Sequence, residues 1–118
     1  MLSGESLIQS QLIKYIQYYY PGILYCASAG GLYTSEKQGR KMKMMGYVKG
    51  FPDIQIFECR NSFSGLFIEL KSEKGVIKKE QRWWNKELNE RGYHAVFCFG
   101  FQEAREIIDK YLSGKISR

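Results

Sequence analysis

The sequence contains little histidine, cysteine or proline, and each scarcity excludes a class of protein or site. His94 is the only histidine, which excludes mechanisms that need two histidines. The three cysteines, Cys26, Cys59 and Cys98, form no CxxC pair, and we interpret them as reduced core thiols rather than as zinc ligands. Only two prolines occur, and no proline-rich linker divides the chain.

Long apolar runs are also missing. No stretch reaches the roughly 20 apolar residues that a membrane-spanning helix requires. No basic segment followed by an apolar run stands at the N-terminus, so no secretory signal is predicted. We therefore expect no contact with a membrane and an intracellular, cytoplasmic location.

Composition and charge indicate a globular domain with a polyanionic partner. Hydrophobic residues make up 44% of the 118 residues, which is enough for a core. At this length we expect a single domain that spans residues 1–118. The formal net charge of +6 favours binding to nucleic acid, although charge alone is a weak indicator.

The spacing of apolar residues predicts four helices and four strands. We expect helices over residues 3–20, 34–45, 78–91 and 104–112, and strands over residues 23–27, 53–58, 66–71 and 93–99. Thr34 is the predicted cap of the second helix, after a break at Gly30 and Gly31. The order α-β-α-β-β-α-β-α predicts an α/β fold, a three-layer sandwich around a mixed sheet.

The candidate catalytic residues lie on a predicted antiparallel hairpin. Asp53 ends the sequence Gly-Phe-Pro-Asp at the start of the first strand, and the second strand ends in Glu69-Leu70-Lys71. Because side chains alternate along a strand, Glu69 and Lys71 share one face. A hairpin symmetric about Ser62 would place Asp53 opposite Lys71 and diagonal to Glu69, within reach of a shared ion.

This grouping suits phosphodiester hydrolysis. Mg²⁺ prefers carboxylate oxygens and water, and it neutralises the charge that builds on a phosphate. A lysine beside the ion can orient or deprotonate a water molecule, or contact the phosphate. Gln81 shares a helix face with Trp84 and Leu88, so it can face the site. Glu5 lies in the first turn of the first helix, where the helix dipole alone would explain a carboxylate.

Taken together, these residues resemble the VRR-NUC (virus-type replication-repair nuclease) branch of the PD-(D/E)XK superfamily along nearly the whole chain. The resemblance implies a restriction-endonuclease-like fold and a Mg²⁺- or Mn²⁺-dependent endodeoxyribonuclease. It implies that Asp53, Glu69 and the Leu70 backbone carbonyl bind the metal, that Lys71 is the catalytic lysine, that Gln81 is a site residue and that Glu5 is an outer acidic member of the site.

Stand-alone members of this size are similar to phage and bacterial proteins that dimerise and cut branched DNA, including four-way (Holliday) junctions. The resemblance therefore implies a homodimeric, structure-selective endonuclease with a role in DNA repair. Where the family often carries an asparagine, before the second helix, this chain has Ser28-Ala29-Gly30-Gly31.

Five cations are candidates for DNA binding: Lys37, Arg40, Lys41, Lys43 and Lys49. The first three share one face of the second helix, which is equally expected of a solvated surface and of a phosphate contact.

Two other functions remain open, a nucleic-acid-binding module without catalysis and a sequence-specific restriction-type nuclease. A pure binder has no reason to gather carboxylates against phosphate, and a chain this short has little surface for base readout. The alternative explanation of Asp53, Glu69 and Lys71 is a surface salt bridge on a solvated sheet face.

Overall fold

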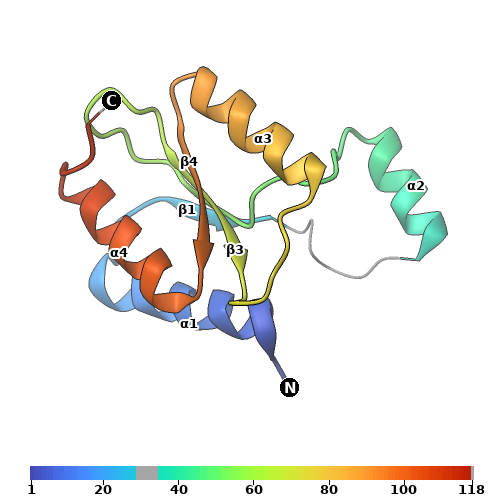
Figure 1. Ribbon diagram of the computed structural model, residues 1–118, viewed down its shortest axis with the longest axis horizontal. Coiled ribbons are helices and arrows are strands. Elements are labelled where there is room, and N and C mark those ends of the chain that lie inside the picture. Colours follow the sequence, from blue (N-terminus) through green and yellow to red (C-terminus); the bar gives the residue numbers. More distant parts are fainter. Residues whose placement is uncertain (29–34, 118) are drawn as a thin grey trace.

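The computed structural model of the chain (Figure 1) describes residues 1–28 and 35–117. Its elements are, in order, α1 (Gly4–Tyr19), β1 (Tyr25–Ala27), α2 (Glu36–Met44), β2 (Ile54–Ile56), β3 (Leu66–Lys71), α3 (Lys79–Glu90), β4 (His94–Phe99) and α4 (Phe101–Leu112). The predicted element order is therefore confirmed. In the part of the chain that the structure describes, no helix combines the length and apolar character needed to cross a membrane.

The four strands form one mixed sheet in the order β1-β2-β3-β4. Neighbouring strands are antiparallel except for β3 and β4, which run parallel. A parallel pair needs a long crossover connection, and α3 supplies it between the two strands.

Helices cover both faces of this sheet, as the predicted sandwich requires. Figure 1 shows α1 and α4 on one side of the sheet and α3 on the other. On the first side, Leu66, Ile68 and Leu70 of β3 pack with Leu12 and Ile16 of α1. On the α3 side a smaller cluster is built around Phe67, Leu88 and Ala95. All six residues of β3 are therefore buried, polar ones included.

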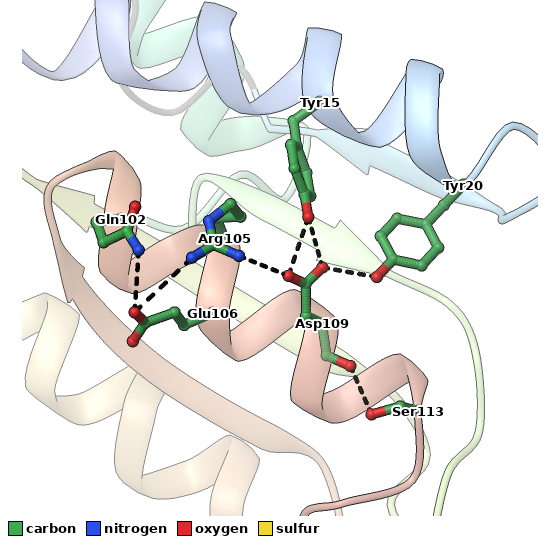
Figure 2. Close-up of polar contacts among 7 residues, drawn as sticks. All are labelled: Tyr15, Tyr20, Gln102, Arg105, Glu106, Asp109 and Ser113. Atoms are coloured by element: carbon green, nitrogen blue, oxygen red, sulfur yellow. Dashed lines mark hydrogen bonds and ion pairs between the residues drawn. The ribbon is translucent and has the colours of Figure 1, made fainter.

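A polar cluster ties α1 to α4 (Figure 2). The hydroxyl groups of Tyr15 and Tyr20 donate hydrogen bonds to the carboxylate of Asp109, at 2.8 and 2.6 Å. Arg105, one turn earlier on α4, forms an ion pair with the same carboxylate at 2.8 Å. Burial and the Asp109 carboxylate together raise the pKa of Tyr15 and the pKa of Tyr20, so both tyrosines stay protonated donors.

The second helix differs from its prediction at its start and in its packing. Ser35 is the N-cap residue: its side chain accepts a hydrogen bond from the Gln38 N–H at 3.1 Å. The predicted cap, Thr34, and the predicted break at Gly30 and Gly31 lie outside the described residues. No side chain of α2 is buried, and in Figure 1 the helix stands apart from the layered body.

The register of the hairpin also differs from the prediction. Ile54 pairs with Ile68 and Gln55 with Phe67, so the next step along the chain brings Asp53 level with Glu69 rather than Lys71. The cause is the turn: Arg60 pairs with Phe63, which centres the turn half a residue before Ser62, and residues 57–59 then face only residues 64–65. This extra residue is a bulge-like offset that the pattern of alternation does not reveal.

Strands β1 and β2 are shorter than predicted. The first begins at Tyr25 rather than residue 23, and the second covers Ile54–Ile56 rather than residues 53–58. Asp53 leaves the ladder because its carboxylate, not its backbone, bonds to β3: the Leu70 N–H donates to Asp53 Oδ2 at 2.7 Å.

Candidate active site

A cleft of about 440 Å³ opens where β3 ends, beside the first turns of α1 and α3. All five residues predicted as catalytic line it: Glu5, Asp53, Glu69, Lys71 and Gln81. They come from four separate segments of the chain, and the fold alone brings them together.

Asp53 is fixed by contacts on both sides of it. Its side chain accepts the Leu70 N–H, as described above. The preceding residue is held by the buried side chain of Gln55, whose amide nitrogen donates to the Pro52 carbonyl oxygen at 2.6 Å. Sequence reasoning missed this role of Gln55, and the available signal was a polar residue between two apolar ones in a core strand.

The segment before Asp53 is packed tightly on α3. Gly50 has φ +93°, and a Cβ atom there would lie 2.7 Å from the backbone carbon of Glu80, so no other residue fits. Next to it, Trp84 donates from Nε1 to the Lys49 carbonyl oxygen at 3.2 Å. The ring of Phe51 meets that of Trp84 edge to face at 4.8 Å. The Gly-Phe-Pro-Asp sequence is thus explained by packing: its first residues hold the segment against α3 and so position Asp53.

Gln81 connects the start of α3 to Glu69. Its amide nitrogen donates to Glu69 Oε2 at 3.2 Å, and its carbonyl oxygen accepts the Lys78 N–H at 2.9 Å. Because the two ends of the amide have different partners, the side chain has one preferred orientation and presents its donor to the carboxylate.

The two central carboxyl groups are electrostatically strained. Burial, together with repulsion from Asp53, raises the pKa of Glu69 to about 9. Burial also raises the pKa of Asp53, although the hydrogen bond from Leu70 opposes this shift. Glu5 adds a further negative charge to both. A cation beside the pair would relieve the repulsion and favour the ionised forms.

Lys71 is held close to this pair without bonding to it. Glu69 and Lys71 are 6% and 4% exposed, so the sheet face that carries them is not solvated. Within residues 1–28 and 35–117, no salt bridge joins Lys71 to either carboxylate. The alternative of a surface salt bridge is therefore wrong, and the ammonium group keeps its donors for another partner.

The donor set fits a divalent cation that also binds substrate. Among the described residues, no three His, Cys, Asp or Glu side chains gather closely enough to hold a metal ion by themselves. A cation here would complete its shell with backbone carbonyl, water or phosphate oxygens. Mg²⁺ is commonly held in this way, by one or two carboxylates together with substrate phosphates.

The predicted DNA-binding cations divide into two groups. Lys49 lines the cleft, whereas Lys37, Arg40, Lys41 and Lys43 lie on the exposed helix α2, outside it. Arg40 forms a solvent-exposed ion pair with Glu36 at 3.4 Å.

Two charged residues of the cleft were not predicted from the sequence. Lys78 and Glu80 also line it, and their place just before Gln81 at the start of a helix was the available signal. Of the loop that departs from the family pattern, Ser28 is described, and Ala29, Gly30 and Gly31 lie outside the described residues.

Comparison with known proteins finds a matching family model and a similar fold. The family model of the VRR-NUC domain matches residues 23–102. A solved structure of a VRR_NUC domain protein resembles the chain with a TM-score of 0.77, at 22% sequence identity, over 98% of both chains. At that identity the likeness shows a shared fold. No curated protein matches the sequence significantly.

Proposed function

Because the chain belongs to the VRR-NUC domain family, it is a nuclease of the PD-(D/E)XK type, and we propose that it is a metal-dependent endonuclease selective for branched DNA. The observation that carries the proposal is the position of the half-buried Asp53 beside the buried Glu69, next to a lysine that neither carboxylate binds. Two ionisable acids are costly at such a position unless a cation and an anionic substrate complete the site.

In this proposal Asp53, Glu69 and the backbone carbonyl of Leu70 hold Mg²⁺ or Mn²⁺, which supplies Lewis-acid stabilisation of the phosphate when bound. Lys71 contacts the attacked phosphate or orients the incoming water through its ammonium group. In the neutral form, its Nζ instead accepts a proton from that water. Gln81 holds Glu69 in one orientation through its hydrogen bond, and Glu5 supplies the outer acidic group. Water attacks the phosphorus directly and the bond from phosphorus to the 3′ oxygen breaks, so the products carry a 5′-phosphate and a 3′-hydroxyl.

Two arguments support branched DNA as the substrate: the basic side chains around the cleft and the two cuts that a four-way junction requires. The exposed cations Lys37, Arg40, Lys41 and Lys43 of α2 contact DNA that flanks the cleft, and Lys49 contacts it at the cleft. Two copies of the chain act together, because a four-way junction has two strands to cut and a symmetric dimer presents two equivalent sites.

The first experiment measures cleavage of labelled four-way junction, flap, single-stranded and linear duplex DNA in Mg²⁺, Mn²⁺ or EDTA. We expect metal-dependent cutting of branched DNA that falls at least a hundredfold in Lys71→Ala, the range for loss of a proton-transfer group. Cutting of linear DNA alone would overturn the junction selectivity. Cutting that tracks sequence rather than branching would support a restriction-type nuclease.

Isosteric variants separate catalysis from binding. Glu69→Gln keeps the shape of the side chain but removes the charge needed to hold a cation, so we expect cleavage to be lost while DNA binding persists. Glu73→Gln is the matched control, because this exposed carboxylate does not line the cleft. Intact DNA binding without cleavage by the unaltered protein in any metal would instead support a binding module.

A further inference from the structure

A second cleft, with a volume of about 500 Å³, adjoins the catalytic one. Glu5 and Asp53 line both clefts, so these two residues stand where the clefts meet. Most of the remaining wall of the second cleft is one face of α1: Ser6, Gln9, Ser10, Ile13, Lys14 and Gln17. A groove thus extends from the catalytic carboxylates in two directions.

The residues of this face follow the helical repeat. Ser6, Ser10 and Lys14 are spaced four apart, and so lie one above the next along α1. The row is about 12 Å long at the usual rise of a helix. Roughly three successive nucleotides of a duplex strand span that length. The opposite face of α1 carries Leu12 and Ile16 into the core, which fixes the row toward the groove.

The polar groups of the row are not used by the fold. In the part of the chain that the structure describes, the side chains of Ser6, Ser10 and Lys14 form no hydrogen bond or ion pair with another residue. Gln17, at the far end of the same face, is by contrast bonded to the Tyr25 hydroxyl at 3.1 Å. Hydroxyl and ammonium donors are the groups that most often contact the phosphates of nucleic acids.

We propose that the row Ser6, Ser10 and Lys14 binds the phosphates of the DNA strand on one side of the cleaved bond. Lys49 and Lys78 in the catalytic cleft contact the strand on the other side. The inference rests on the proposed nuclease function and adds a strand-binding surface on α1, apart from the basic helix α2. The DNA strand passes from one cleft to the other beside Asp53. There the cation lies between the phosphate and the carboxylates of Glu5 and Asp53, which would otherwise repel it.

The test compares the unaltered protein with the triple variant Ser6→Ala, Ser10→Ala, Lys14→Ala. Alanine favours helix, so α1 is expected to stay folded, and thermal unfolding checks this. Binding of fluorescent branched DNA is measured by anisotropy in EDTA over a range of salt concentrations. We expect binding about tenfold weaker, and a salt dependence lower by about one unit of slope because one cation is removed. In Mg²⁺ we expect the KM for cleavage to rise with little change in kcat.

The matched control is Lys115→Ala, which removes the same charge at the opposite end of the sheet. The exposed segment around Lys115 lies against the β2–β3 turn, where Asn61 donates to the Ile116 carbonyl oxygen at 3.1 Å (Figure 1). We expect this control to bind DNA like the unaltered protein.

The outcomes separate the two proposals. Unchanged binding by the triple variant, or equal weakening by Lys115→Ala, overturns the role of α1 and leaves the nuclease proposal standing. Failure of the unaltered protein to bind or cut DNA overturns the proposed function itself, and the α1 surface with it.

Discussion

Gly50 occupies a position where a side chain has no room, since a Cβ atom would lie 2.7 Å from the Glu80 backbone. We expect Gly50→Ala to push the segment away from α3 and to disturb the hydrogen bond between Leu70 and Asp53. The strained backbone should lower the free energy of unfolding by about 1–3 kcal/mol. Urea denaturation and a cleavage assay measure the two effects.

Gly22→Ala is the control, because a Cβ atom at Gly22 meets no other atom within 4 Å. Equal effects of the two substitutions would contradict a special fit at Gly50.

Glu69 makes stability depend on pH. Its pKa is raised from the usual 4.5 of a glutamate to about 9, so the folded protein binds the proton more tightly than the unfolded chain. The contribution of this group is therefore full at low pH and is lost as pH rises through this interval. Without divalent metal, we expect Glu69→Gln to lose less stability than the unaltered protein between about pH 5 and about pH 9. The free energy of unfolding is measured by urea denaturation at several pH values. An equal change of this free energy with pH in the two proteins would refute the raised pKa of Glu69.

The identities of the candidate site residues could be read from the sequence, but their contacts could not. Alternation along β3 correctly placed Glu69 and Lys71 on one face, and a two-residue error in register still left Asp53 on that face. The same error hid the pairing of Asp53 with Glu69, since the offset arises in the loop. The bond from Gln55 to Pro52 depends on a loop conformation that no pattern of residue types encodes.

At the scale of the elements, α1 is joined to α4 through one carboxylate. Asp109 accepts hydrogen bonds from Tyr15 of α1 and from Tyr20, the residue that caps α1, and pairs with Arg105 of its own helix. We expect Asp109→Ala to lower the free energy of unfolding by about 2–4 kcal/mol, because several donors lose their partner at once.

The neighbouring Lys110→Ala is the control, because this side chain is exposed and near-neutral effects are usual at such positions. Chemical denaturation monitored by tryptophan fluorescence gives both values. A loss for Asp109→Ala no larger than that for the control would show that apolar packing alone holds α1 in place.

Helix ends were predictable where the chain chemistry forces them, and so were the ends of β3, but the ends of β1 and β2 were not. Pro21 and Gly22 follow the end of α1, and Gly92, with φ +94°, follows α3. The second predicted strand, by contrast, extended to residue 58, past the last paired residue, Ile56. A strand ends where its partner turns away, and this depends on the neighbouring strand rather than on the strand's own sequence.

At the scale of the whole molecule, the order and layering of the elements followed from periodicity, but the isolation of α2 did not. An amphipathic sequence predicts a helix without saying whether the fold offers it a partner, and α2 buries no side chain. Substitution of its exposed lysines therefore costs the core little.

We expect the triple variant Lys37→Ala, Lys41→Ala, Lys43→Ala to unfold at the same temperature as the unaltered protein but to bind DNA more weakly. The salt dependence of binding should fall by about 0.9 for each phosphate contact that is lost. Anisotropy titrations at several salt concentrations measure this. An unchanged slope would mean that these lysines form an ordinary solvated surface.

The four segments that carry Glu5, Asp53, Glu69 with Lys71, and Gln81 are spread over more than half of the chain. The candidate catalytic cluster therefore does not exist in a chain that has been synthesised only as far as β3, nor in one unfolded by heat or urea. Recovery of DNA cleavage after dilution from denaturant therefore reports the last steps of folding. It requires more of the native structure than the return of the helical signal does.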